Sequence, residues 1–289
     1  MNPLTDIQTF VRQIAAPDGY PLSATVYQST APEAVLIIAP AVAAPQTLYR
    51  HFAAFMAGQG VDCITFDYRG TANSLAKNSP YRIQLEDWGK QDIETIIRLA
   101  RTSYADKTPV HLLGHSIGGQ LLGLAPSSKE LSRIVHIAVS APYWRRWPLK
   151  MSLKMLLLGK AIIPLLSAFR AQFPSNVLGL GKINVPSSAT RQWARWMSRP
   201  EYLFDPVFKL DLTGYQQLDQ PLLAIGFSDD ELAPPINIDA LLDQFPEAQI
   251  TREQIDVPGL GVGPAGHAGF FKARFQDSLW QKVADWLMR

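Results

Sequence analysis

The stretch VHLLGHSIGG, residues 110–119, decides the fold class of this chain. Its first five residues form an apolar run with the length of a buried strand, and the glycines that follow are typical of a sharp turn into a helix. The pattern Gly-x-Ser-x-Gly places Ser116 at the apex of that turn, with its hydroxyl above the carboxyl end of the strand. Side chains at positions 114 and 118 would collide with the neighbouring turn, which explains the glycine at both. The stretch predicts a strand–turn–helix unit of an α/β protein, with Ser116 as a nucleophile.

Short apolar runs and longer helical segments alternate on both sides of this unit. Eight segments are predicted as strands, at residues 8–16, 20–28, 34–39, 62–67, 110–114, 134–140, 221–227 and 249–257. Segments with helical spacing are predicted as helices, at residues 48–59, 85–104, 235–245 and 270–288. This alternation is typical of a mostly parallel sheet flanked by helices, led here by an antiparallel pair. Between residues 143 and 215 the alternation stops, and helix-like, tryptophan-rich sequence replaces it. We therefore predict one α/β domain over residues 1–142 and 216–289, with a helical cap inserted at 143–215.

Composition narrows the class of protein further. With 289 residues, 47% of them hydrophobic, the chain can build one large core. Its single cysteine, Cys63, excludes an internal disulfide framework and a multi-cysteine metal site. Residues 1–16 lack the charged start and apolar block of a signal peptide. The apolar stretch at 155–169 is too short and too interrupted to span a bilayer. We expect a cytoplasmic protein with no metal site.

A serine hydroxyl needs a base to become a nucleophile at neutral pH. In chains with this turn, the order along the sequence is serine, then acid, then histidine. Of the five histidines, only His267 comes after the strand at 221–227, which the acid is expected to follow. It ends the glycine-rich segment GLGVGPAGH, which can bend an imidazole across the top of the sheet. His267 is therefore the predicted general base, and His115, inside the turn motif, is expected to pack beside the nucleophile.

The acid is expected in the segment SDDELAP that follows the seventh predicted strand. A carboxylate there would hold the tautomer of the imidazole and stabilise its cation. Asp229 and Asp230 are adjacent and point in different directions, so only one of them can reach His267. The spacing to Pro234 favours Asp230, which leaves Asp229 as a turn residue and Glu231 as the third choice.

An oxyanion formed at the nucleophile needs two backbone donors. The N–H of Ile117, at the start of the helix after the turn, is the first. The second is expected from the loop PAVAAP at residues 40–45, in which Pro40 has no N–H. Ala41 and Val42 are the two alternatives for this donor.

Three motifs together resemble the α/β-hydrolase superfamily: FDYRGTANS at 66–74, GHSIGG at 114–119 and GHAGFF at 266–271. The likeness is greatest to a bacterial group of predicted hydrolases near the serine aminopeptidase-like and monoacylglycerol-lipase-like branch, and it extends through the cap. The resemblance implies an α/β-hydrolase fold with the nucleophile at Ser116, the acid at Asp230 and the base at His267. The chain departs from many relatives in two places, where Ala39-Pro40 replaces a His-Gly pair and Ala72 replaces a glycine.

This combination predicts an ester hydrolase that forms an acyl-enzyme on Ser116, without a cofactor. The expected substrate is a small-molecule ester with an apolar acyl part, and the sequence carries no nucleic-acid-binding motif. Two alternatives remain open. One is an amide or peptide hydrolase similar to serine aminopeptidases, and the other is a non-catalytic protein that uses the fold to bind a ligand or partner.

The predicted cap is basic and rich in tryptophan. Eleven Lys and Arg residues and no Asp or Glu lie between Glu130 and Glu201. Candidate substrate contacts in the cap are Trp144, Trp147, Trp193, Trp196, Arg191 and Arg195. Arg191, Arg195 and Arg199 recur every four residues, so one helix face should carry three cations. Either the cap is a solvated lid packed on its tryptophans, or it contacts anionic lipid or an anionic, apolar substrate.

Overall fold

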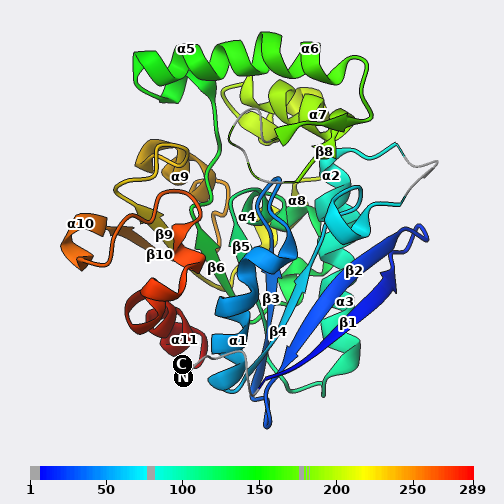
Figure 1. Ribbon diagram of the computed structural model, residues 1–289, viewed down its shortest axis with the longest axis vertical. Coiled ribbons are helices and arrows are strands. Elements are labelled where there is room, and N and C mark those ends of the chain that lie inside the picture. The colour runs from blue at the N-terminus through cyan, green and yellow to red at the C-terminus, as the bar shows by residue number, and fades with distance from the viewer. Residues whose placement is uncertain (1–6, 77–81, 176–178, 180, 182) are drawn as a thin grey trace.

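The computed structural model describes residues 7–76, 82–175, 179, 181 and 183–289. In this part of the chain, eight strands form one sheet in the order β1-β2-β4-β3-β5-β6-β9-β10 (Figure 1). Their bounds are β1 (Gln8–Ala15), β2 (Pro21–Gln28), β3 (Ala34–Ala39), β4 (Val61–Phe66), β5 (Val110–His115), β6 (Arg133–Ile137), β9 (Pro221–Phe227) and β10 (Gln249–Ile255). β2 runs antiparallel to β1 and β4, and every other pairing is parallel. The predicted mostly parallel, eight-stranded sheet is confirmed.

Burial separates the centre of the sheet from its edges. Every residue of β3, β4 and β5 is buried, whereas most residues of the two edge strands, β1 and β10, are exposed or half-buried. A parallel sheet covered on both faces needs apolar residues at every position, which explains the unbroken apolar runs in the centre. Charged side chains such as Arg12 and Glu253 on the edges discourage pairing with another chain.

The helices mostly lie where the sequence predicts them, with irregular ends. The segment predicted as one helix at 85–104 contains α2 (Leu85–Asp87), the π-helical η3 (Trp88–Ile93) and α3 (Glu94–Ser103). The helix expected at 48–59 opens with a 3-10 turn, η1 (Gln46–Tyr49), and continues as α1 (Arg50–Gly58). The last predicted helix, at 270–288, is regular only in α11 (Gln281–Leu287), after 3-10 and π-helical turns.

One predicted strand is shorter than expected. The segment 134–140 leaves the sheet after Ile137, because Ala138 has a φ of 53°, which is incompatible with an extended strand. The residues after Ile137 are apolar because of packing and not because of strand pairing, since Val139 is buried against Gly119 of the turn after β5.

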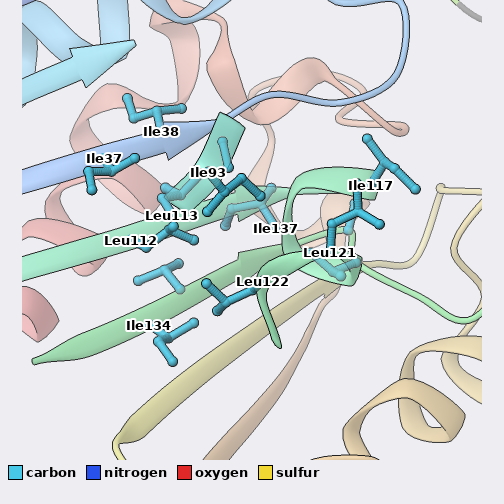
Figure 2. Packing of buried hydrophobic residues seen from close by; sticks show 14 of the residues in the cluster. Ile37, Ile38, Ile93, Leu112, Leu113, Ile117, Leu121, Leu122, Ile134 and Ile137 are labelled. Atoms are coloured by element: carbon cyan, nitrogen blue, oxygen red, sulfur yellow. The ribbon is translucent and has the colours of Figure 1, made fainter. Parts of the chain in front are cut away.

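The turn after β5 rests on a dense apolar layer. Figure 2 shows Ile117 and Leu121, from and just after the short helix α4 (Ile117–Gln120), among isoleucine and leucine side chains of β3, β5 and β6. All of these side chains are buried. Tight packing of this kind resists displacement, so the backbone that carries Ser116 has a rigid support.

Most of the described residues of the segment 143–215, which we call the cap, lie above the carboxyl ends of the central strands (Figure 1). The cap contains α5 (Leu149–Leu157), the π-helical η7 (Leu158–Ile162), α6 (Ile163–Ser167), the short pair β7 (Gln172–Phe173) and β8 (Val185–Pro186), and α7 (Ser187–Met197). The predicted boundary at 215 falls within α8 (Thr213–Gln217), whose Tyr215 packs on Gly123 of the core. The end of the cap is therefore already part of the core packing. Two further helices, α9 (Pro235–Leu242) and α10 (Val257–Leu260), follow β9 and β10 respectively.

Candidate active site

Ser116 lies in the turn between β5 and α4, with φ 52° and ψ −118°. A Cβ at Gly118 would overlap the carbonyl oxygen of Ala39, and one at Gly114 would overlap the backbone of Gly119. Both glycines are therefore required by close backbone contacts, as the sequence indicates. A non-glycine residue with this backbone is strained, and such strain persists only where the surrounding structure imposes it.

Three predicted residues meet at the carboxyl edge of the sheet although they are far apart in sequence. His267 Nε2 lies 2.9 Å from Ser116 Oγ, and His267 Nδ1 lies 2.8 Å from Asp230 Oδ2. The Asp230 carboxylate also accepts hydrogen bonds from the N–H groups of Leu232 and Ala233. Burial opposes ionisation of Asp230, but the hydrogen bond and charge of His267 and the two N–H groups outweigh it, so its pKa lies below the ordinary value.

This environment determines where the protons lie. An ionised Asp230 can only accept, so Nδ1 of His267 carries the hydrogen and Nε2 is free to accept from the Ser116 hydroxyl. The arrangement therefore has the hydrogen-bond order that a serine nucleophile, its base and an orienting carboxylate require.

Asp229, expected to be only a turn residue, has a second task. Its two carboxylate oxygens accept hydrogen bonds from the N–H groups of Ala265 and Gly266, each at 2.9 Å. These are the two residues before His267. The adjacent acids thus divide the work, with Asp230 orienting the imidazole and Asp229 holding the backbone that carries it. The sequence gives no local signal for this contact, because its partners are more than thirty residues apart.

A chain of hydrogen bonds that the sequence did not predict runs behind the base. His115 Nε2 lies 2.8 Å from the carbonyl oxygen of His267, and His115 Nδ1 lies 2.9 Å from Tyr49 Oη. Tyr49 Oη in turn accepts the N–H of Ala41 at 2.8 Å. A carbonyl only accepts, so His115 carries its hydrogen on Nε2 and accepts the Tyr49 hydroxyl hydrogen on Nδ1. Burial, with repulsion from His267, lowers the pKa of His115 to about 3, which keeps the ring neutral.

This chain also separates the two alternatives for the second oxyanion donor. The N–H of Ala41 is already engaged by Tyr49, which counts against Ala41. The N–H of Val42 has no hydrogen-bond acceptor among the described residues. Ile117 is the first residue of α4, so its N–H has no acceptor within the helix either. Val42 and Ile117 are therefore the pair of donors that the geometry leaves available beside Ser116.

A cavity of about 420 Å³ lies above Ser116 and His267, which both line it. Its floor includes His115 and the loop after β3, and cap residues such as Trp147 and Trp193 form its roof. Most of its lining is apolar. Thr47 and Arg50, which also line the cavity, are exposed, so the cavity reaches the surface near the start of α1. The volume falls in the range of small-molecule sites.

Comparison with known proteins agrees with this geometry. The model of a family described as the alpha/beta hydrolase family matches residues 36–277, which is more than half of the chain. The protein belongs to the α/β-hydrolase family. The resemblance and the fold predicted from the sequence motifs are thereby confirmed. Among curated proteins, none matches the sequence significantly.

Several solved structures share the fold at low sequence identity. A soluble variant of monoglyceride lipase from Saccharomyces cerevisiae, in complex with a substrate analogue, superposes with a TM-score of 0.68 at 16% identity, covering 100% of this chain and 98% of that one. An esterase from Exiguobacterium antarcticum has a TM-score of 0.63 at 16% identity, covering 97% and 100%. An esterase from Pyrococcus furiosus has 0.61 at 13%, covering 98% and 91%. At such identities the likeness shows the α/β-hydrolase fold alone.

The structure divides the four tryptophans predicted for substrate contact. Trp147 and Trp193 line the cavity. Neither Trp144 nor Trp196 is among the described residues that line the cavity. Trp196 is fully buried against Tyr202, where it supports the cap, and Trp144 is half-buried with the Arg145 guanidinium over its ring. The prediction is corrected for these two, because helical spacing alone cannot tell a cavity wall from packing inside the cap.

The two arginines predicted as substrate contacts are also corrected. Arg191 donates to the carbonyl oxygen of Ser167, and Arg195 lies over the ring of Phe208, so both are used within the cap and neither is among the described residues that line the cavity. Arg199 lies 4.0 Å from Asp205. Because α7 ends at Met197, Arg199 lies beyond the helix, and the three arginines do not form a free cationic face on it.

Across residues 7–76, 82–175, 179, 181 and 183–289, no group of three or more His, Cys, Asp or Glu side chains is arranged to hold a metal ion. Cys63 is buried within β4, and burial raises the pKa of its thiol well above the ordinary value. Its thiolate is therefore suppressed, and it has no part in the site.

Proposed function

We propose that this protein is a serine hydrolase that cleaves carboxylic esters through an acyl-enzyme. The observation that carries the proposal is the continuous Ser116–His267–Asp230 hydrogen-bond chain at the floor of an apolar cavity. Membership of the α/β-hydrolase family supports it. The yeast lipase of the same fold was solved with a substrate analogue, which supports a small-molecule substrate.

In the first half of the reaction, Ser116 Oγ attacks the carbonyl carbon of the ester while His267 Nε2 takes the hydroxyl proton. The negative charge that develops on the carbonyl oxygen is stabilised by the N–H groups of Val42 and Ile117. Asp230 remains ionised and stabilises the imidazolium. When the tetrahedral intermediate collapses, His267 gives its proton to the leaving alcohol, and the acyl group stays on Ser116.

In the second half, water replaces the alcohol. His267 takes a proton from the water as it attacks the acyl carbon, and then returns that proton to Ser116 Oγ when the carboxylic acid leaves. The cavity wall formed by Trp147 and Trp193 suits an apolar acyl chain, since it offers few hydrogen-bonding groups. The same atoms would serve amide hydrolysis, but no observed contact favours an amide leaving group.

A fluorophosphonate probe tests the nucleophile directly. We expect the wild-type protein and Ser128→Ala to be labelled, and Ser116→Ala to remain unlabelled. Ser128 is a matched control because it is buried, lies outside the cavity and has a hydroxyl with no hydrogen-bond partner among the described residues. An unlabelled wild-type protein would favour the non-catalytic alternative, and labelling of Ser116→Ala would point to another nucleophile.

The substrate class is tested with p-nitrophenyl esters of increasing acyl length alongside the matching p-nitroanilides. An apolar cavity predicts that kcat/KM rises from acetate to medium-chain esters and that the anilides react far more slowly. Faster hydrolysis of amino-acid anilides than of any ester would replace the esterase proposal by the aminopeptidase-like alternative.

A further inference from the structure

The outermost helices of the cap expose a row of apolar side chains. Leu149, Leu153, Leu157, Leu165 and Phe169 are between 55% and 95% exposed. They account for five of the twelve large hydrophobic side chains that are exposed in the described part of the chain. In Figure 1, α5 and α6 cross the top of the molecule as a continuous rod, on the side away from the sheet. We call this row, with Lys150, Lys154, Lys160 and Arg170, the outer face of the cap.

The spacing of the row makes it continuous. Its members recur every four residues, and the exposed Ala161 fills the one missing step. In a straight α-helix such a row would drift around the axis, but the wider turn of η7 in the middle counteracts the drift. The row from Leu149 to Leu165 therefore stays on the exposed side of the rod, and Phe169 follows just beyond the end of α6.

The opposite side of the same rod is apolar too. Met155 and Leu158 are buried and line the cavity, and Ile163 is fully buried. A helix on the surface of a soluble domain normally pairs an apolar inner face with a polar outer face. Here both faces are apolar. Packing of the cap on the rest of the protein accounts for the apolar inner face, but it does not account for the apolar outer face.

The charges beside the row indicate what covers it. Lys150, Lys154, Lys160 and Arg170 are exposed. In the part of the chain that the structure describes, none of the four lies within 4.0 Å of a carboxylate. No Asp or Glu occurs between Glu130 and Glu201. An apolar row flanked only by cations is complementary to a surface that is apolar below and anionic above.

A second copy of the chain fits this face poorly. In a symmetric dimer the same patch meets itself, so the four cations would face one another with no carboxylate between them. Like charges brought together in this way oppose association. The charge pattern thus favours a lipid surface over self-association.

We propose that the outer face of the cap docks on an anionic lipid surface, with α5 and α6 lying in the plane of the membrane interface. No helix among the described residues is long and apolar enough to cross a membrane, and the contact is peripheral. Because Met155 and Leu158 of the same rod line the cavity, docking brings the roof of the cavity against lipid. The proposal moves the lipid contact expected from the sequence from α7 to α5 and α6. It does not rest on the proposed ester hydrolysis.

Co-sedimentation with vesicles, in the absence of any ester, tests the proposal. We expect binding to mixed phosphatidylcholine–phosphatidylglycerol vesicles, weaker binding at high salt, and little binding to pure phosphatidylcholine. The combined variant Leu153→Gln, Leu157→Gln and Leu165→Gln should lose at least about tenfold in the partition coefficient. The combined variant Lys150→Gln, Lys154→Gln and Lys160→Gln should lose about fivefold for each cation removed.

Matched variants separate this face from any other. Val11→Gln with Ile236→Gln replaces exposed apolar side chains outside the cap, and Lys107→Gln, Lys129→Gln and Lys272→Gln together remove three exposed cations that also lie outside it. Both controls should bind like wild type. Thermal unfolding verifies that each variant is folded, and because the replaced side chains are exposed, their Tm values should stay near that of the wild type.

Three results would overturn the proposal. Equal binding to neutral and anionic vesicles, or no binding at all, would remove the lipid surface as the occupant. Loss of binding on replacing Arg191, Arg195 and Arg199 by Gln, with the outer-face variants unaffected, would return the contact to α7. If the wild type ignores vesicles and sediments as a dimer that the leucine variant converts to a monomer, the face is an interface between two copies.

Discussion

The floor and the roof of the cavity are built from different interactions. At the floor, Ser116, His267 and Asp230 are joined by hydrogen bonds of 2.8 to 2.9 Å, and Asp229 and His115 hold the backbone around His267. At the roof, side chains such as Trp147 and Trp193 present mainly apolar surface to the cavity. Hydrogen bonds fix distance and direction, whereas apolar contacts are non-directional and depend mostly on buried area.

This difference assigns separate tasks to the two regions. Chemistry needs atoms held in one geometry, which the floor provides on the rigid edge of a packed sheet. Selection of a substrate by size needs volume and apolar surface, which the roof provides. Variants at the floor should therefore change the rate for every substrate, and variants at the roof should change the ranking of substrates.

The largest effect is expected at the nucleophile and base. Ser116→Ala and His267→Ala should each lower kcat by on the order of a million-fold, because members of such a set act as a unit. For the same reason the double variant should be little worse than either single one. Steady-state kinetics on one short p-nitrophenyl ester measure all three. A shared mechanism at the floor would be contradicted if the kcat losses of the two single variants multiplied in the double variant, or if either single variant kept near-wild-type turnover.

The adjacent acids offer a sharper test of the floor. Asp230→Asn should lower kcat by about four orders of magnitude, because it favours the wrong tautomer of His267. Asp229→Ala removes two hydrogen bonds to the backbone before His267 and should cost far less activity, with a loss of about 1 to 3 kcal/mol in the free energy of unfolding. Kinetics and urea denaturation separate the two. A larger kcat loss in Asp229→Ala would reverse the assignment.

Buried histidines of the core should make the protein sensitive to acid. Burial lowers the pKa values of His111, His115 and His136 to about 4, about 3 and about 3, from an ordinary value of 6.5. As pH falls below about 6.5, the unfolded chain takes up protons on these rings and the native state does not, so stability decreases. The folding equilibrium should fall by up to about tenfold per pH unit for each histidine. Asp230, whose pKa is lowered, adds its own loss only as pH falls below about 4.

Urea denaturation between about pH 7 and about pH 5 measures this slope. His136→Leu should reduce the slope of the free energy of unfolding against pH by nearly the contribution of one bound proton. Both ring nitrogens of His136 are buried without a hydrogen-bond partner among the described residues. His51→Leu is the matched control at a partly exposed histidine, whose pKa is lowered by partial burial and by the charge of Arg50, and it should reduce the slope much less than His136→Leu does. Equal slopes in all three proteins would show that the buried rings do not govern acid sensitivity.

Tyr49→Phe tests the chain of hydrogen bonds behind the base. It leaves Ala41 N–H and His115 Nδ1 without the partners that Tyr49 Oη provides, which should cost about 1 to 3 kcal/mol of stability. We expect kcat to fall on the order of tenfold for all esters, because the loop that carries Ala41 and the turn that carries His115 and Ser116 are then no longer held in place by Tyr49. Tyr68→Phe is the control, since Tyr68 Oη is buried with no hydrogen-bond partner in the described chain. Similar results for both would mean that the Tyr49 contacts do not position the site.

The smallest effect is expected at the roof. Trp193→Ala should change the ratio of kcat/KM between long and short esters by roughly tenfold, since the apolar contact that a chain makes there is worth about 1 to 3 kcal/mol. Trp144→Ala, at a half-buried tryptophan that does not line the cavity, should leave the ratio unchanged. If Trp193→Ala instead lowered kcat equally for all chain lengths, the division of tasks between floor and roof would fail.

Local sequence was sufficient wherever the structural cause is local. The turn at Ser116 could be predicted because Gly114 and Gly118 are required by contacts within and beside the turn itself. The parallel sheet could be predicted because buried strands need unbroken apolar runs. His267 and Asp230 could be proposed from their order and from the ends of strands, since the carboxyl ends of parallel strands meet at one edge.

Only the tertiary structure decided which distant groups meet. The contacts of Asp229 with the loop before His267, and of His115 with Tyr49, join segments that no periodicity relates. Helical spacing placed Arg191 on a free face, but its charge is used by the carbonyl oxygen of Ser167. The same holds for the cap tryptophans, because whether a ring meets a cavity or a neighbouring side chain depends on how helices pack. A hydrogen-bond partner or a cavity wall is a property of the assembled fold, whereas a turn and a buried strand are properties of a few consecutive residues.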